Sequence, residues 1–212
     1  MDWLEVIREI SILIGVWVAI YGIDSWRREH TGRRQYELAE ETLAMFYEAR
    51  DAVRHMRHPM TSTGETEDVK LGEGETEKAW EARKNASVVF KRYNTHQELF
   101  GKLWAMRYRF MVQFGQEKAK PFNDLQGIVN EVMISARMLA RLWARDSFHS
   151  EERWNRHLDS VEKCEAIFWE GVDDEDPINP KLDKVIEEIE KTCSTIIKGK
   201  GTIYGFLNRP LT

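Results

Sequence analysis

The sequence predicts an all-α protein with an N-terminal transmembrane helix, and three observations lead to that fold class. An uncharged apolar run, Ile10 to Ile23, lies between Trp3 and Trp26. Apolar residues recur at helical spacing through most of the remaining chain. The prolines, which break helices, all fall between these periodic segments, at positions 59, 121, 177, 180 and 210. We therefore expect a membrane helix that continues into a stalk, followed by a four- to five-helix bundle.

The first segment, residues 1–34, is predicted to be a membrane anchor with a basic juxtamembrane end. Its uncharged run makes about 21 Å of helix, whereas a bilayer core is about 30 Å thick. Between Trp3 and Trp26 the helix is long enough, and tryptophan favours the headgroup level. Two alternatives stay open, a helix that lies in the interface and a helix buried in a soluble assembly.

Four arginines follow the apolar run and predict the orientation of the anchor: Arg27, Arg28, Arg33 and Arg34. Basic residues are retained on the cytoplasmic side of a membrane. The expected location is therefore a bacterial inner membrane, crossed once, with the N-terminus outside and the helical domain in the cytoplasm. The same arginines are expected to meet anionic lipid headgroups.

Small residues at helical spacing predict that the anchor self-associates. The expected oligomerisation face is Ser11, Gly15, Ala19 and Gly22. Small residues let helices approach closely in lipid. Three charged residues lie in the first third of the span from Trp3 to Trp26: Glu5, Arg8 and Glu9. Charges at membrane depth face a bundle interior or an aqueous cavity, so we expect these three to line the interior of an oligomer or pore.

Composition excludes several classes of function. The chain has 212 residues and a net charge of −5, which gives RNA binding no support. The two cysteines, Cys164 and Cys193, form no CxxC pair, and the chain contains neither a metal-binding motif nor a phosphate-binding loop. We expect no metal and no cofactor.

After the anchor, the chain divides into four segments. Residues 35–58 are expected to form a helical stalk, residues 59–76 an acidic mobile loop, residues 77–198 the helical bundle, and residues 199–212 a C-terminal tail. Within the bundle we expect helices at about 77–114, 121–143, 150–170 and 180–198. The stalk carries an apolar heptad pattern: Ala39, Thr42, Phe46, Ala49, Val53 and Met56. This face is expected to pack either on partner chains or on its own domain.

One arrangement of residues in the stalk has a catalytic pattern. Arg50 is followed by Asp51, and His55 lies five positions after Arg50. An arginine stabilises the charge of a phosphorane, and a histidine transfers the proton between hydroxyl and leaving group. With six histidines and many arginines, composition alone predicts roughly 1.5 such spacings by chance. The alternative interpretation is a basic, solvated helix end formed by Arg50, Arg54, His55, Arg57 and His58.

This pattern resembles the R-polar-x(3–5)-H motif of HEPN domains. The resemblance implies a helical bundle, metal-independent ribonuclease activity, and Arg50 with His55 as its catalytic residues. The motif lies in the first long helix, whereas HEPN motifs lie in a late helix of the bundle. A membrane helix joined to a helical domain is also similar to the architecture of defence-associated bacterial membrane proteins with a degenerate HEPN-like bundle.

Two polar groups complete the candidate sites. Arg137, Arg141 and Arg145 form a basic stripe that is expected to bind a partner, or else to pair with acids or solvent. Arg92 and His96 are expected to form either a polar pocket or a satisfied structural network. We expect a non-enzymatic scaffold or pore-forming effector, with phage defence as the implied setting. The alternatives are a membrane-tethered HEPN-like ribonuclease and a monomeric adaptor, and the protein partner is not predicted.

Overall fold

A computed structural model describes residues 3–144, 148, 150–172 and 175–198, with the backbone alone for residues 4–9 and 63. Helices and no strands occur in this described part, which confirms the all-α fold class. Seven α-helices and two short 3-10 helices follow one another: α1 (Trp3–Arg57), η1 (Thr63–Glu65), α2 (Glu77–Thr95), α3 (Gln97–Phe114), η2 (Glu117–Ala119), α4 (Lys120–Leu142), α5 (Glu151–Asn155), α6 (Leu158–Phe168) and α7 (Asn179–Ile197).

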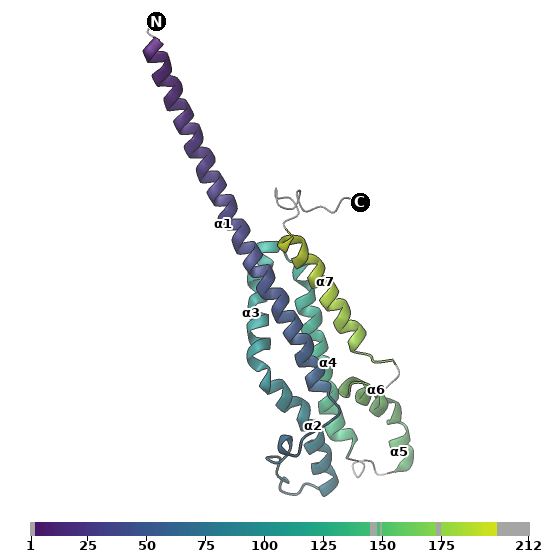
Figure 1. Cartoon of the computed structure of the whole chain (residues 1–212). Helices are drawn as coiled ribbons and strands as arrows, with labels where there is room; N and C mark the ends of the chain where they lie inside the picture. The colour runs from purple at the N-terminus through teal and green to yellow at the C-terminus, as the bar shows by residue number, and fades with distance from the viewer. Residues whose placement is uncertain (1–2, 145–147, 149, 173–174, 199–212) are drawn as a thin grey trace. The chain divides into compact units, whose positions relative to one another are not determined.

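The chain divides into two compact units. One contains Met1–Glu41 and Ser194–Thr212, and the other is the continuous segment Thr42–Cys193. The second unit is the helical bundle, in which the last turns of α1 lie with α2, α3, α4, α6 and most of α7 (Figure 1). The bundle therefore begins inside the segment that was predicted to be a separate stalk.

The heptad face of the stalk packs within its own chain. All six of its residues are fully buried: Ala39, Thr42, Phe46, Ala49, Val53 and Met56. The Phe46 ring meets the Phe122 ring of α4 edge-on, with centroids 4.9 Å apart. The Thr42 hydroxyl donates to the sulfur of Met106 on α3 at 3.1 Å. Of the two predicted partners for this face, the structure supports the chain's own domain.

Two of the predicted helices are each interrupted. The helix expected at 77–114 is two helices, α2 and α3, because His96 between them leaves helical geometry at φ −104° and ψ 8°. Asn94 and Thr95 are weak helix formers, and no proline or glycine marks this break. The helix expected at 150–170 is likewise divided into α5 and α6.

The predicted mobile loop at 59–76 is attached to the bundle at both ends. Glu65 accepts two hydrogen bonds from the Arg92 guanidinium, at 2.7 and 3.0 Å. Glu75 accepts two from Arg83, at 2.8 and 2.6 Å. These two acids give the loop fixed contacts that its composition alone did not predict.

Candidate functional site

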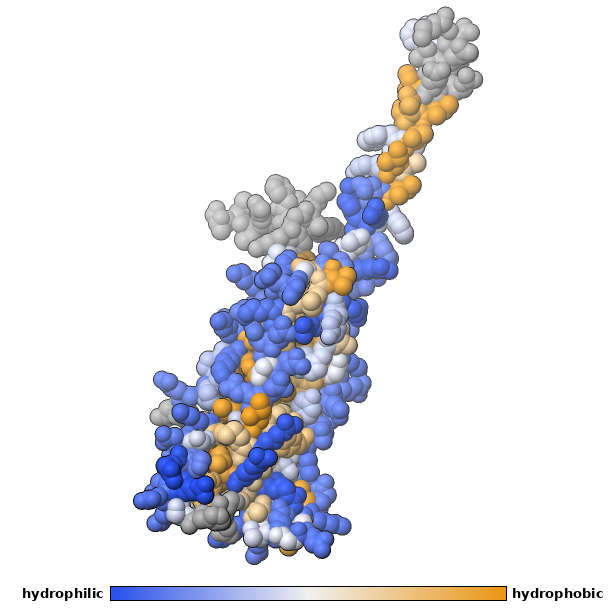
Figure 2. All heavy atoms as spheres, turned by 180° about the vertical axis from the view of Figure 1, so that it is seen from behind, coloured by the Kyte–Doolittle hydropathy of each residue, from blue (hydrophilic) through white to orange (hydrophobic). Residues whose placement is uncertain are grey.

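The apolar segment of α1 is exposed along its whole length. Every side chain from Ile10 to Arg34 is exposed, with Leu13 at 69% and Ile20 at 63%. Figure 2 shows a continuous apolar surface on this segment, followed by hydrophilic residues. Within the described residues, α1 is the one helix long and apolar enough to cross a membrane. From Trp3 to Trp26 it would extend about 35 Å, which is enough for a core of about 30 Å.

Aromatic side chains stack along the same segment. The Trp17 and Tyr21 rings stack with centroids 5.6 Å apart, and Trp26 and His30 stack at the same separation. Both pairs are one helical turn apart, so the rings lie on the helix surface. Trp26 is thereby positioned beside a polar imidazole at the end of the apolar run, the arrangement that suits a membrane–water interface.

The four juxtamembrane arginines are not equivalent. Arg28 pairs with Asp24 at 2.5 Å, and Arg33 pairs with Glu37 at 3.0 Å. No such acidic partner occurs for Arg27 or Arg34 among the residues that the structure describes. These two lie seven residues apart, on one face of the helix. The prediction from the sequence treated the four arginines alike, although each of these two acids lies four positions from its arginine.

The predicted oligomerisation face is open. Ser11, Gly15, Ala19 and Gly22 are all exposed. A Cβ atom built on Gly15 or Gly22 would meet no atom within 4 Å. The face is therefore accessible to another helix, and a larger side chain there would not disturb the described chain. The side chains of Glu5, Arg8 and Glu9, the predicted pore charges, lie outside the described part.

Arg50 and His55 contact different parts of the bundle. The Arg50 guanidinium lies 5.6 Å from the centroid of the Tyr47 ring, and its Nε donates to Asp51 at 3.3 Å. Tyr47 in turn donates a hydrogen bond to Glu190 of α7. Five residues correspond to a rotation of about 140° around a helix, so the two side chains of the catalytic prediction diverge. The structure does not bring them into one site.

His55 instead meets His96 at the break between α2 and α3. Nδ1 of His55 and Nε2 of His96 are 2.9 Å apart, and the rings are nearly perpendicular. Such a contact requires one imidazole to donate and the other to accept, so at least one ring is neutral. Burial, and then the charge of His55, lower the pKa of His96 below its ordinary value of 6.5.

Arg92 holds the chain that leaves α1. It is 3% exposed, and besides Glu65 it donates to three carbonyl oxygens: those of His55, His58 and Met60. Arg92 lowers the pKa of Glu65 to about 2 by hydrogen bonding to its carboxylate. Of the two interpretations of the Arg92 and His96 group, the satisfied structural network describes Arg92.

Arg57 is fully buried and joins three helices. Its Nε and Nη2 donate to carbonyl oxygens at the C-terminal end of α6, those of Ile167, Ala166 and Trp169. Its guanidinium also makes a two-point pair with Asp176, at 3.0 and 2.8 Å. Asp176 then accepts from the backbone N–H groups of Ile178 and Asn179 at the start of α7. The expected solvated helix end is therefore wrong for Arg57, because its donors satisfy buried helix-end carbonyls.

The basic stripe on α4 borders a groove. Arg137 and Arg141 are exposed and line a hollow between α2 and α4, whereas Arg145 lies outside the described residues. Elsewhere in the described part, no three His, Cys, Asp or Glu side chains form a metal-ligating group. Both cysteines are buried thiols.

No protein family, curated protein or solved structure matches this chain. Neither the resemblance to HEPN domains nor that to defence-associated membrane proteins is therefore tested by comparison.

Proposed function

We propose that this chain is a single-span membrane protein that tethers a helical bundle to the cytoplasmic face of a bacterial inner membrane and self-associates through its anchor. The observation that carries the proposal is the uninterrupted exposure of the apolar segment, Ile10–Ile23. Contiguous exposed apolar surface is costly in water and marks contact with a membrane or another protein.

The length and the ends of the segment favour lipid. Trp3 and Trp26 are separated by the thickness of a bilayer core, and a helix in the core satisfies its own backbone hydrogen bonds. A helix that lies in the interface would need a polar face along its length, and residues 10–23 carry no charge. Arg27 and Arg34, which have no acidic partner in the described part, favour the cytoplasmic side for the residues that follow.

Self-association rests on the open small-residue face. In lipid, packing between helices replaces the hydrophobic effect as the attraction, and small residues let two backbones approach. Gly15 and Gly22 offer such a surface, and in the described part of the chain a Cβ added at either would meet nothing within 4 Å. The protein would then act as an oligomeric scaffold. A pore-forming effector goes one step beyond this proposal. Glu5, Arg8 and Glu9 are charged, and charges at membrane depth would face an aqueous interior between the subunits.

Membrane insertion is tested by placing a charge in the middle of the segment. Val16→Arg is expected to cost about 2.5–3.5 kcal/mol of insertion free energy. Glu40→Arg, an exposed position on the same helix beyond the apolar run, is the matched control. Alkaline carbonate extraction of membranes should leave wild type and Glu40→Arg in the pellet and release Val16→Arg. Release of the wild type would refute the span.

Self-association is tested by the molecular mass of the full chain in detergent micelles. Gly15→Leu fills the small-residue face without meeting any other described part of the chain, and Val16→Leu places the same side chain on a neighbouring face. We expect an oligomer for wild type and Val16→Leu, and a smaller species for Gly15→Leu. A monomeric wild type would refute self-association and support the alternative function of a monomeric adaptor.

The ribonuclease alternative has a direct test. The proposal predicts that cellular RNA stays intact when the wild type is expressed and is the same with His55→Ala. RNA degradation by the wild type that disappears in His55→Ala would refute the scaffold proposal and support the ribonuclease.

A further inference from the structure

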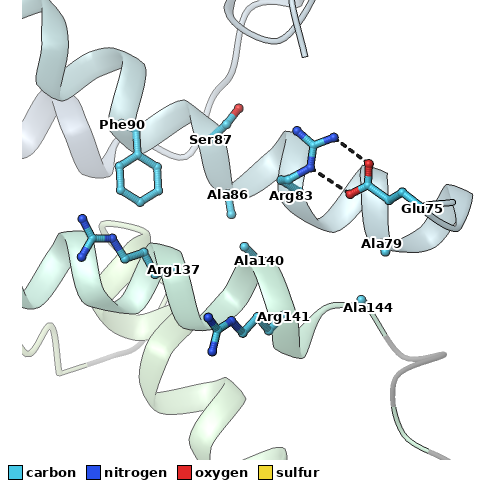
Figure 3. A pocket seen from close by; sticks show the side chains of 10 residues that line it. All are labelled: Glu75, Ala79, Arg83, Ala86, Ser87, Phe90, Arg137, Ala140, Arg141 and Ala144. Carbon is cyan, nitrogen blue, oxygen red and sulfur yellow. Dashed lines mark hydrogen bonds and ion pairs between the residues drawn. The ribbon is translucent and has the colours of Figure 1, made fainter. Parts of the chain in front are cut away.

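The bundle carries a groove of about 480 Å³ between α2 and α4. Four alanines line it, Ala79 and Ala86 from α2 with Ala140 and Ala144 from the other side. Figure 3 shows Ala86 and Ala140 facing each other. Alanine side chains end at Cβ, so the neighbouring helices leave a hollow that larger side chains would fill. Pockets for small molecules have volumes of about 300–1,000 Å³ and mostly apolar walls.

One end of the groove presents an oriented guanidinium. Arg137 of α4 lies over the ring of Phe90 of α2, with Cζ 5.8 Å from the ring centroid (Figure 3). A cation over an aromatic ring is attracted by the electrons of that ring. The N–H groups of a guanidinium match the two oxygens of a carboxylate or phosphate.

A second guanidinium follows one helical turn later. Arg141 is exposed, lines the same groove, and like Arg137 has no carboxylate paired with it among the described residues. Like charges at i and i+4 on a helix repel each other. An anion bound between Arg137 and Arg141 would reduce that repulsion.

The acidic residue of the groove does not oppose an anion. Glu75 is held by Arg83 through two hydrogen bonds, at 2.8 and 2.6 Å, and hydrogen bonding to Arg83 lowers its pKa to about 2. Arg83 also donates to the carbonyl oxygen of Lys70 at 2.8 Å. This pair forms one wall of the groove with its charges mutually compensated.

We infer that the groove binds a small organic anion, made of an apolar body with one carboxylate or phosphate group. The apolar body would lie on the alanines and Phe90, and the acid group on the N–H edges of Arg137 and Arg141. The size of the groove favours a small ligand over a helix of another protein, since a stable protein interface buries about 800 Å² on each partner.

The test is isothermal titration calorimetry of the full chain in detergent micelles. The probes are 1-naphthyl phosphate and 1-naphthoate, with 1-naphthalenemethanol as the neutral analogue and inorganic phosphate as the anion without an apolar body. We expect both naphthyl anions to bind at least tenfold more tightly than either comparator. Equal binding of the alcohol, equal binding of inorganic phosphate, or no binding of the naphthyl anions would overturn the proposal. If a glutamate-rich helical peptide binds and the naphthyl anions do not, the groove would bind a protein partner and not a small ligand.

Variants locate the binding. The double variant Arg137→Gln with Arg141→Gln removes both donors, and Ala140→Leu fills the groove. Each is expected to weaken naphthyl phosphate binding at least tenfold. Arg153→Gln with Arg156→Gln makes the same change in charge at two exposed positions, in α5 and directly after it, and should leave binding unchanged. Because Arg137 and Arg141 are exposed, their double variant should keep the thermal unfolding of the wild type, and unchanged binding in that variant refutes the site.

Discussion

Two regions of this protein have unusual environments for their residues: the apolar segment of α1 is exposed, and two arginines of the bundle are buried. Ile10–Ile23 is apolar and exposed, whereas Arg57 is charged and fully buried and Arg92 is 3% exposed. The two regions differ in which groups offset the free-energy cost of this unusual environment. Each buried guanidinium finds a carboxylate and several carbonyl oxygens within the chain.

The apolar segment finds no equivalent within the described residues. A buried charge that lacked its partners would cost several kcal/mol, so the bundle must supply them wherever an arginine is enclosed. Exposed apolar surface has the same requirement in water, but lipid or another helix satisfies it equally well. The bundle therefore offsets the cost of its buried charges with its own groups. The apolar segment requires lipid or another helix to cover it.

The largest expected effect comes from removing a buried arginine. Arg57→Ala removes the cationic partner of Asp176 and the donors to three buried carbonyl oxygens, and should lower the free energy of unfolding by about 3–5 kcal/mol. Arg50→Ala removes an exposed pair with Asp51 and should cost less than about 1 kcal/mol. Denaturant unfolding of the full chain in micelles measures both. Equal losses would contradict the difference between buried and exposed arginines.

The second effect is an acid-sensitive contribution from Glu65. Its pKa is lowered from 4.5 to about 2 by Arg92, so the folded state holds this proton less tightly than the unfolded state. The resulting stabilisation is complete above pH 4.5 and is lost as the pH falls towards about 2. It amounts to at most about 3 kcal/mol. Unfolding measured between pH 7 and pH 2.5 should show this loss in the wild type.

Glu65→Gln should flatten that part of the profile. Glu98→Gln is the control, because Glu98 pairs with Lys102 at the surface, where solvent screens the charges. A profile that keeps its slope in Glu65→Gln would show that Arg92 owes its burial to the carbonyl oxygens alone.

The third effect separates the juxtamembrane arginines. Arg27→Gln with Arg34→Gln removes the two without acidic partners and should weaken attraction to anionic lipid by about 1 kcal/mol for each residue. Arg28→Gln with Arg33→Gln removes the two paired arginines and should have a smaller effect. Native mass spectrometry can count the anionic lipids retained by each variant. Equal losses would show that the pairs with Asp24 and Glu37 do not persist at the membrane.

The smallest effect is expected near neutral pH, at the contact between His55 and His96. Burial and the charge of His55 lower the pKa of His96 in the folded state, whereas the unfolded state keeps the ordinary value of 6.5. Below pH 6.5 the unfolded state therefore binds this proton more readily than the folded state. Stability should therefore decline as the pH falls below 6.5. His96→Gln should remove this decline in unfolding experiments between pH 8 and pH 5. A gain in stability at lower pH would contradict a neutral, partly buried His96.

The helical periodicity of the sequence predicted most helices, because the buried face of each helix recurs within a few residues. In the helix expected at 180–198, four apolar residues recur at helical spacing, and all four are buried: Leu182, Ile186, Ile189 and Cys193. The break at His96 was missed, because its partner His55 lies 41 positions away and no local breaker marks it. Arg57 was assigned to a solvated helix end for the same reason, since its partner Asp176 is 119 positions away.

The sequence by itself determined the all-α class, the apolar segment and the small-residue face, since each depends on the order of neighbouring residues along one helix. Only the tertiary structure decided that the heptad face of α1 packs on its own domain and that His55 meets His96. It also showed that Arg137 and Arg141 border an alanine-lined groove. These features depend on which distant helices meet, and burial and charge pairing between them are properties of the packed chain alone.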